Sequence, residues 1–162
     1  MKKPSHGGTA ATRFLNTNGV AYTEQFYEYV EHGGTEVAAG SLGVDQHHVV
    51  KTLVMEDDTG APLIVLMHGD KTVSTRYLAR QIGVKRVQPC TPQAAQRHSG
   101  YLAGGTSPFG TRKKLRVCLE RSILELERIW INGGRRGFLV CIAPREVVRT
   151  LAPALVEAAL KD

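Results

Sequence analysis

Residues 49–67, with the sequence VVKTLVMEDDTGAPLIVLM, decide how this chain folds. Residues 49–55 are rich in β-branched and apolar side chains, which is typical of a strand. The tetrapeptide Asp57-Asp58-Thr59-Gly60 is a turn sequence, and the apolar residues 63–67 that follow it predict an antiparallel partner strand. We therefore expect a β-hairpin in this stretch.

Lys51 is the unusual residue of this hairpin. Because side chains alternate along a strand, Lys51 shares a face with Val49, Leu53 and Met55. A lone ammonium group among apolar neighbours is costly unless it is paired or lines a pocket. Lys51 is therefore a candidate functional residue. The alternative is a lysine on an edge strand whose amino group reaches solvent.

Capping residues and glycine stops predict short helices around the hairpin. These helices follow Thr9 and end before Gly19, cover residues 35–42, follow Ser74 and end at Gly83, run from Pro92 to about His98, begin at Pro144, and begin at Pro153. The other predicted strands cover residues 20–29, 115–119, 128–132 and 138–142, and the alternation of apolar residues in 115–119 predicts a half-buried strand. Together these elements predict one mixed α/β domain that spans residues 1–162.

The charge of the chain is divided unevenly. The net charge is +6, yet residues 1–70 hold four Lys or Arg against nine Asp or Glu, whereas residues 71–162 hold seventeen against six. A basic half of this kind attracts a polyanion such as RNA through phosphate contacts. The alternative is a basic face that serves solubility only.

Several function classes find no support in the sequence. Cys90, Cys118 and Cys141 are an odd number of cysteines without CxxC spacing, so neither a disulfide framework nor a four-cysteine zinc site is supported. The six histidines show no metal-ligand spacing, so we expect most of them at the surface and expect neither a metal nor a cofactor. No apolar run approaches the roughly 20 residues of a membrane span, and residues 1–8 lack a signal-peptide pattern. We expect a cytoplasmic protein.

Two glycine-rich segments are candidate ligand-binding loops. Residues 100–110, GYLAGGTSPFG, combine adjacent glycines, hydroxyls and a stiffening proline, so backbone N–H groups can approach an anion or a carbonyl oxygen. This segment lacks the ending of a phosphate-binding P-loop, and the alternative is a tight connection. Residues 132–137, NGGRRG, carry two guanidinium groups that suit phosphates. The alternative there is a bulged hairpin with solvated arginines.

The strand VVKTLV, the loop GYLAGGTSPFG and the turn NGGRRG, in this order and at these separations, resemble the YbaK family of aminoacyl-tRNA deacylases. The similarity runs from about Thr9 to Leu160 and includes IGVKRV at residues 82–87 and AAQRHSGYL at residues 94–102. That family resembles the editing insertion of bacterial prolyl-tRNA synthetases. The resemblance implies a core over about residues 9–160, with a mixed, largely antiparallel, barrel-like sheet surrounded by short helices.

The resemblance also implies the residues of the site. The essential lysine of the family matches Lys51, its glycine-x-x-x-proline loop matches residues 104–108, and a tyrosine on the early strand matches Tyr27. The implied substrate-binding residues are Tyr27, Gly104, Gly105, Thr106, Ser107, Pro108, Asn132, Gly133 and Gly134. The resemblance and the basic charge of the second half together indicate contacts to tRNA phosphates by Arg112, Lys113, Lys114, Arg116, Arg135 and Arg136.

Within the family, the chain looks most like the branch that deacylates Cys-tRNA(Pro). The branch specialised for Ala-tRNA(Pro) is expected to place a histidine near the late glycine turn, and residues 132–137 contain none. An acidic residue expected from some relatives just after this turn is also missing, because residues 138–142 are wholly apolar.

The expected mechanism uses the substrate as its own nucleophile, since the chain presents no recognisable one. The thiol of a cysteinyl ester attacks its own carbonyl and expels the tRNA. Backbone N–H groups of residues 104–107 hold the carbonyl or α-amino end, while Lys51 binds the terminal adenosine phosphate or offsets developing negative charge. tRNA is the expected partner, and prolyl-tRNA synthetase is a second one if it supplies tRNA identity. Three alternatives stay open: a deacylase of Ala-tRNA(Pro) that uses water, a module that binds tRNA or synthetase without catalysis, and a domain without either role.

Overall fold

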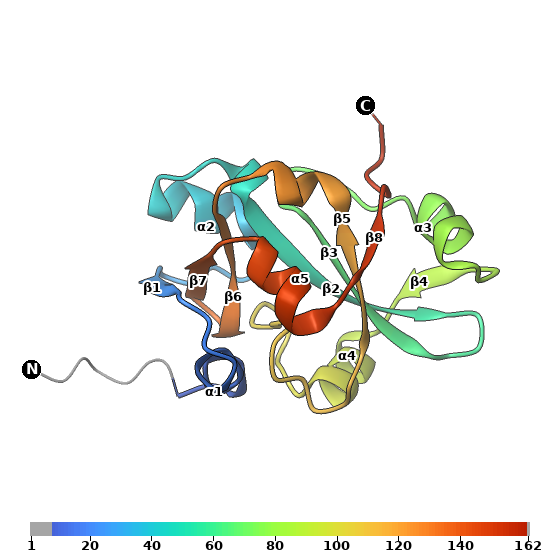
Figure 1. Cartoon of the computed structure of the whole chain (residues 1–162), viewed down its shortest axis with the longest axis horizontal. Helices are drawn as coiled ribbons and strands as arrows, with labels where there is room; N and C mark the ends of the chain where they lie inside the picture. Colours follow the sequence, from blue (N-terminus) through green and yellow to red (C-terminus); the bar gives the residue numbers. More distant parts are fainter. Residues whose placement is uncertain (1–7, 162) are drawn as a thin grey trace, which may run out of the picture.

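The predicted hairpin forms and lies in the middle of a sheet (Figure 1). The computed structural model describes residues 8–161, so residues 1–7, on which the signal-peptide argument rests, and residue 162 lie outside the described part. The hairpin strands are β2 (Val49–Asp57) and β3 (Pro62–His68), which pair antiparallel. The turn between them closes because Asp57 Oδ1 accepts hydrogen bonds from the N–H groups of Thr59 and Ala61, at 2.8 and 3.0 Å.

Six further strands extend this hairpin into a mixed sheet within the described residues. They are β1 (Thr23–Phe26), β4 (Val87–Pro89), β5 (Arg116–Glu120), β6 (Ile129–Arg135), β7 (Phe138–Ile142) and β8 (Ala154–Val156). The order is β1-β7-β6-β2-β3-β5-β8, and β4 pairs with β2 beside this path. β2 is parallel to β6, β3 to β5 and β5 to β8, while the other pairings are antiparallel. The expected mixed α/β architecture is confirmed, although the sheet is open rather than closed into a barrel, because β1 and β8 at its ends each pair with one neighbour.

Short helices surround the sheet (Figure 1). Those in residues 8–161 are α1 (Ala10–Thr17), α2 (Gly34–Leu42), α3 (Thr75–Ile82), α4 (Pro92–Ser99), α5 (Arg145–Leu151) and the 3-10 helices η1 (Gln46–His48) and η2 (Arg121–Glu125). The predicted caps are confirmed: the hydroxyls of Thr9, Ser74 and Thr91 accept backbone hydrogen bonds at the starts of α1, α3 and α4. Glycines in the left-handed conformation end α2, α3 and α4.

The segment after Pro153 is the strand β8, so the helix predicted there is wrong. β8 pairs with β5, and Glu120 at the end of β5 accepts a hydrogen bond from the N–H of Ala158 at 2.7 Å. These tertiary contacts keep the segment extended against its local preference for helix. Residues 117–120 of β5 are all buried rather than half buried, because apolar clusters cover both faces of the strand. β1 is shorter than the predicted strand, since only residues 23–26 pair with β7.

Alternation along β3 divides the core into two clusters, one on each face of the sheet. Ile64 and Leu66 lie in the cluster that contains Phe109, whereas Val65 and Met67 lie in the other. Burial of each such side chain contributes roughly 1.5–3 kcal/mol to folding. A third cluster lies where α2 packs on β2 and β7. None of the helices in residues 8–161 is long and apolar enough to span a bilayer.

Candidate active site

A cavity of about 450 Å³ lies between the start of α2, the start of β2, the glycine-rich loop before β5 and the turn between β6 and β7. The third apolar cluster contributes Ala38, Val49 and Leu139 to its wall. Six of the predicted site residues, from four separate segments, meet in its lining: Tyr27, Lys51, Gly104, Thr106, Asn132 and Arg136. The fold therefore gathers the three sequence motifs around one cavity.

Lys51 is half-buried in this lining. Burial lowers the pKa of its ammonium group, and the charge of Asp70 partly offsets this effect. Within residues 8–161, the Lys51 ammonium makes no hydrogen bond or ion pair. It is therefore available to an anionic ligand or to negative charge that develops during a reaction.

Asp70 belongs to a hydrogen-bonded group that the sequence analysis missed. Asp70 Oδ1 lies 2.8 Å from Nδ1 of His47, and the His47 ring stacks on His68 with the centroids 3.7 Å apart. His68 is only 1% exposed, and its ring nitrogens lie 2.8 Å from the carbonyl oxygen of His47 and 2.7 Å from Ser122 Oγ. The pairing of the hairpin strands was a signal for this group, because it places His68 opposite Val50, which is next to Lys51 in the chain.

His47, His68 and Asp70 have potential metal-ligand atoms within 4.8 Å of one another. Both ring nitrogens of His68 are already hydrogen-bonded. The two rings are also nearly parallel, at 7°, so their in-plane lone pairs lie side by side and do not converge on one point. The arrangement fits a hydrogen-bond network that holds Asp70 in place.

The glycine-rich loop contributes to the cavity two lining residues whose backbone N–H groups are free within residues 8–161. Gly104 and Thr106 line it, and within the described chain their N–H groups have no hydrogen-bond partner. The N–H of Gly105, in contrast, donates to the carbonyl oxygen of Leu102 at 2.9 Å. Gly105 lies outside the cavity lining and packs against the backbone of Arg136.

Ser107 and Pro108 are buried behind this loop and do not line the cavity. The Ser107 hydroxyl accepts a hydrogen bond from the N–H of Phe109 at 3.2 Å. The Tyr101 hydroxyl donates to the carbonyl oxygen of Phe109 at 2.5 Å. These contacts brace the loop from the core side.

Asn132 links the late glycine turn to the loop, and residues 132–135 of this predicted turn form the irregular end of β6, where the pairing with β7 shifts register. The Asn132 Nδ2 donates to the carbonyl oxygen of Gly104 at 3.2 Å, and its Oδ1 accepts from the N–H groups of Gly134 and Arg135 at 2.6 and 3.1 Å. Gly133 and Gly134 lie outside the cavity lining and pack closely against the rings of aromatic residues. Of this turn, Asn132 and Arg136 reach the cavity.

Tyr29 is a lining residue that the sequence analysis did not select. Its hydroxyl lies beside Gly104, where an added Cβ would stand 2.6 Å from it. The Arg136 guanidinium lies 5.0 Å from the centroid of the Tyr29 ring, and its Nε donates to the carbonyl oxygen of Ala103 at 2.8 Å. Tyr27 lines the same cavity, and burial raises the pKa of its hydroxyl. The sequence signal for Tyr29 was its position two residues after Tyr27 in an extended segment, where side chains two apart point to the same side.

The remaining predicted phosphate contacts lie outside the cavity lining. These exposed residues are Arg112, Lys113, Lys114, Arg116 and Arg135. The first three are on the segment that leads from the glycine loop into β5, where Lys113 Nζ lies 3.2 Å from Nδ1 of His98. They suit the backbone of a polyanion rather than a small group inside the cavity.

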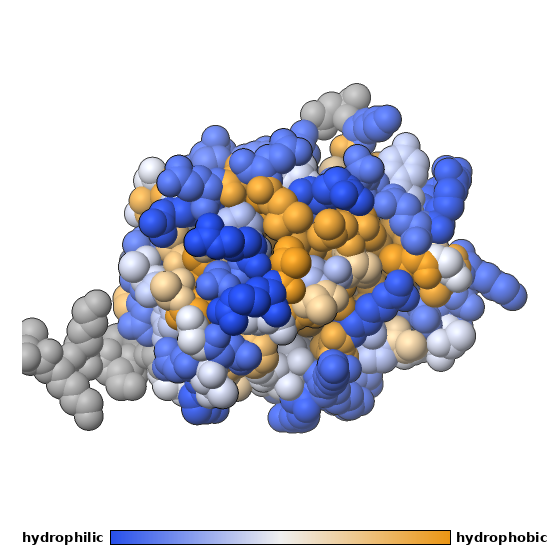
Figure 2. Space-filling model, viewed as in Figure 1, coloured by the Kyte–Doolittle hydropathy of each residue, from blue (hydrophilic) through white to orange (hydrophobic). Residues whose placement is uncertain are grey.

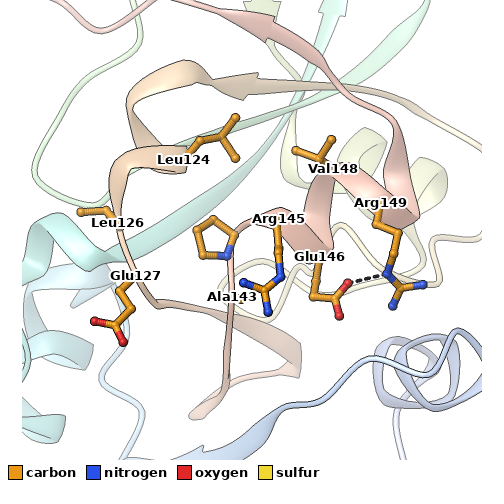
Figure 3. A pocket seen from close by; sticks show the side chains of 9 residues that line it. Leu124, Leu126, Glu127, Ala143, Arg145, Glu146, Val148 and Arg149 are labelled. Atoms are coloured by element: carbon orange, nitrogen blue, oxygen red, sulfur yellow. Dashed lines mark hydrogen bonds and ion pairs between the residues drawn. The ribbon is translucent and has the colours of Figure 1, made fainter.

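A larger cavity, of about 710 Å³, lies between η2 and α5 (Figure 3). Leu124, Leu126 and Val148 line it beside an ion pair between Glu146 and Arg149. Figure 2 shows that hydrophobic side chains gather in the middle of the face that carries α5. None of the predicted site residues lines this cavity, so it is not the candidate active site.

Comparison with known proteins identifies a family for this chain. A model of the aminoacyl-tRNA editing domain matches residues 32–150, which contain the lysine strand, the glycine loop and the late turn. The chain belongs to this family. A protein of Enterococcus faecalis named "Putative Cys-tRNA(Pro)/Cys-tRNA(Cys) deacylase EbsC" is 26% identical to this editing domain over 162 residues, 99% of each chain. The proline–tRNA ligase of Lactiplantibacillus plantarum is 21% identical over 137 residues, which are 85% of this chain and 22% of the ligase.

Solved structures share the fold of this editing domain. The hypothetical protein APE2540 superposes with a TM-score of 0.85 at 22% identity, over 93% of this chain and 99% of that chain. A structure described as "a putative trans-editing enzyme for prolyl tRNA synthetase" superposes with a TM-score of 0.83 at 20% identity, over 98% and 100% of the two chains. The resemblance inferred from the sequence motifs is confirmed, and aminoacyl-tRNA editing is the activity class of this chain.

Proposed function

We propose that this editing domain removes cysteine from mischarged tRNA(Pro), with the thiol of the substrate as the attacking group. One observation carries the proposal: among the described residues, the cavity is lined by Lys51 and by two residues with free backbone N–H groups, Gly104 and Thr106, but by no activated nucleophile. Its described lining residues include no cysteine and no serine. The hydroxyls of Thr35 and Thr106 donate to backbone carbonyl oxygens, and the buried hydroxyl of Thr52 has no partner. No base is therefore bonded to a threonine hydroxyl in this lining.

A cysteinyl ester supplies the missing nucleophile. The thiol loses its proton, and its sulfur forms a bond to the carbonyl carbon of the same residue. The bond from that carbon to the ribose oxygen then breaks, and the ribose oxygen takes up the proton. The products are a free tRNA hydroxyl and a cysteine thiolactone that water later opens. Because a thiol is a far better nucleophile than a hydroxyl, the same site leaves seryl esters largely intact.

In this mechanism the protein supplies positioning and charge. The free N–H groups of Gly104 and Thr106 hold the carbonyl oxygen while negative charge develops on it. Lys51 binds the terminal adenosine phosphate or offsets the same charge, and Tyr27 and Asn132 border the aminoacyl group. Phosphates farther along the tRNA contact the exposed basic residues without sequence readout. These residues are Arg112, Lys113, Lys114, Arg116 and Arg135.

The relation to proline–tRNA ligases supports a synthetase partner. In the ligase of Lactiplantibacillus plantarum, the segment similar to this chain is part of a longer enzyme. A prolyl-tRNA synthetase that binds this domain would present tRNA(Pro) to the cavity and supply tRNA identity.

Deacylation assays test the proposed function. The substrates are Cys-tRNA(Pro), Ala-tRNA(Pro), Ser-tRNA(Pro) and Cys-tRNA(Cys), and the proteins are wild type, Lys51→Ala and the control Lys85→Ala, whose lysine is exposed outside the cavity. We expect the wild-type protein to deacylate the cysteinyl esters alone. The rate should be roughly a hundredfold or more lower in Lys51→Ala and unchanged in Lys85→Ala. tRNA affinity should fall only modestly in Lys51→Ala.

Each other outcome has a definite meaning. Full activity of Lys51→Ala would remove Lys51 from the mechanism, and equal turnover of seryl and cysteinyl esters would exclude thiol attack. Deacylation of Ala-tRNA(Pro) would instead favour attack by water on the ester. Turnover of Cys-tRNA(Cys) would place tRNA selection outside this domain.

A further inference from the structure

Residues 102–105 of the glycine-rich loop form a tight turn at the cavity. The N–H of Gly105 donates to the carbonyl oxygen of Leu102, and Gly104 has a φ of +83°. A positive φ at the third residue is typical of a type II turn, which glycine adopts without strain. The type I turn is a close alternative. Rotation of the peptide group between Ala103 and Gly104 converts one into the other and reverses the direction of the Gly104 N–H.

Arg136 bonds the carbonyl oxygen that distinguishes the two turns. Its Nε donates to the carbonyl oxygen of Ala103 at 2.8 Å. In a trans peptide the C=O and the following N–H point in opposite directions, so this bond also fixes the direction of the Gly104 N–H. Asn132 holds the next carbonyl oxygen, that of Gly104, at 3.2 Å. Both peptide groups that flank the Gly104 Cα are thus held by side chains from the segment of β6 and β7.

Arg136 is itself held in place. The Tyr29 ring lies against its guanidinium, 5.0 Å from the centroid. A Cβ added to Gly105 would stand 2.8 Å from the backbone nitrogen of Arg136, so the turn and the arginine backbone are in close contact. A surface arginine that only attracts phosphate needs neither contact, whereas one that orients a peptide group does.

We propose that Arg136 is a positioning residue of the editing reaction: it keeps residues 102–105 in the type II turn, so that the Gly104 N–H stays directed toward the substrate carbonyl oxygen. This inference rests on the proposed function of the cavity and replaces the phosphate contact that the sequence implied for Arg136. Its effect falls on the chemical step, because this N–H interacts most strongly with the charge of the transition state. A phosphate contact would act on tRNA affinity and its salt dependence.

Arg136→Lys separates the two roles, since lysine keeps the positive charge but lacks the planar donor geometry of the guanidinium. The measurements are the single-turnover deacylation rate at saturating protein and the tRNA Kd at several salt concentrations. We expect a rate roughly tenfold to hundredfold lower, with Kd and its salt slope unchanged. The control Arg86→Lys, an exposed arginine outside the cavity, should change neither. An unchanged rate with weaker, less salt-dependent binding in Arg136→Lys would overturn the proposal.

An NMR measurement distinguishes failure of this proposal from failure of the proposed function. The amide signal of Gly104 in nitrogen-15-labelled protein reports the turn without any substrate. Arg136→Lys should shift this signal, whereas Gly60, a turn glycine with a φ of +84°, should keep its signal. A shifted Gly104 signal in a protein whose wild type deacylates none of the esters would reject the proposed function and retain the control of the turn by Arg136. An unmoved Gly104 signal would overturn the positioning role whatever the activity.

Discussion

Asn132 donates a hydrogen bond of 3.2 Å to the carbonyl oxygen of Gly104, a residue 28 positions earlier in the chain. The other end of the same amide accepts the N–H groups of Gly134 and Arg135. One side chain therefore connects the glycine-rich loop to the late turn. The geometry of the cavity depends on this connection as well as on the two motifs themselves.

Asn132→Asp should separate the two ends of the amide. A carboxylate still accepts the N–H groups of the turn, but it cannot donate to Gly104 and repels its carbonyl oxygen. We expect a loss of about 1 kcal/mol in the free energy of unfolding, together with slower deacylation. Asn132→Ala should cost more, roughly 1–3 kcal/mol, because the N–H groups of the turn also lose their acceptor. Urea unfolding of both variants checks this, and equal losses of stability would contradict it.

Gly104→Ala should abolish deacylation. The new Cβ would stand 2.6 Å from Tyr29 Oη, at a φ of +83°. Gly60 offers a matched control, because its φ is +84° and nothing lies within 4 Å of an added Cβ. Both variants should lose about 1–2 kcal/mol of stability from the left-handed conformation, but Gly60→Ala should keep full activity. Thermal unfolding and deacylation rates check the pair. An active Gly104→Ala protein would show that the contact with Tyr29 does not limit the cavity.

The elements that sequence reasoning predicted correctly depend on residues close together in the chain. The Ser74 cap accepts from Tyr77, three positions away, and the hairpin turn is closed by Asp57 within five residues of sequence. Lys51 could also be selected locally, because a charge within an apolar strand is an anomaly in itself. Asn132 was selected through the family resemblance, but its bond to Gly104 exists only once the fold brings two loops together.

The features that sequence reasoning missed have distant partners. β8 depends on pairing with β5, which overrides the helical preference of residues 154–160. Tyr29 and Asp70 are ordinary residues of an extended segment and a turn, and their position near Arg136 and Lys51 follows from tertiary structure alone. No local pattern marks such residues as members of a site.

Asp70→Asn should move the alkaline limb of the deacylation profile to lower pH. Burial lowers the pKa of Lys51, and the charge of Asp70 partly offsets this shift. Without that negative charge, the ammonium group loses its proton at a lower pH than in the wild type. Rates are measured against pH and corrected for uncatalysed ester hydrolysis. Asp58→Asn, in the hairpin turn, is the control and should leave the limb in place. Coincident limbs for Asp70→Asn and wild type would exclude a charge effect of Asp70 on Lys51.

His68→Gln should reduce the loss of stability below neutral pH. Burial lowers the pKa of His68 in the folded protein, whereas in the unfolded chain it is about 6.5. Between these two values the unfolded chain binds a proton that the folded chain does not, so the free energy of unfolding falls as the pH drops. Neutral His68 thus contributes stability that is present above about pH 6.5 and lost as the pH falls toward its folded pKa.

The effect of His68 on acid stability can be distinguished from that of the neighbouring titratable groups. Burial raises the pKa of the Asp70 carboxyl and the hydrogen bond with His47 lowers it, and the net result is a lowered pKa. The stability that ionised Asp70 contributes is therefore lost only at a pH below the range in which an aspartate ordinarily titrates. His47 and Lys71 remain in the variant, and the glutamine amide can still donate to the carbonyl oxygen of His47. His32→Gln, which changes a side chain that is 93% exposed, should keep the wild-type slope. Urea unfolding at about pH 7, 6 and 5 gives the slopes. If His68→Gln matches the wild type across this range, the acid sensitivity comes from other groups.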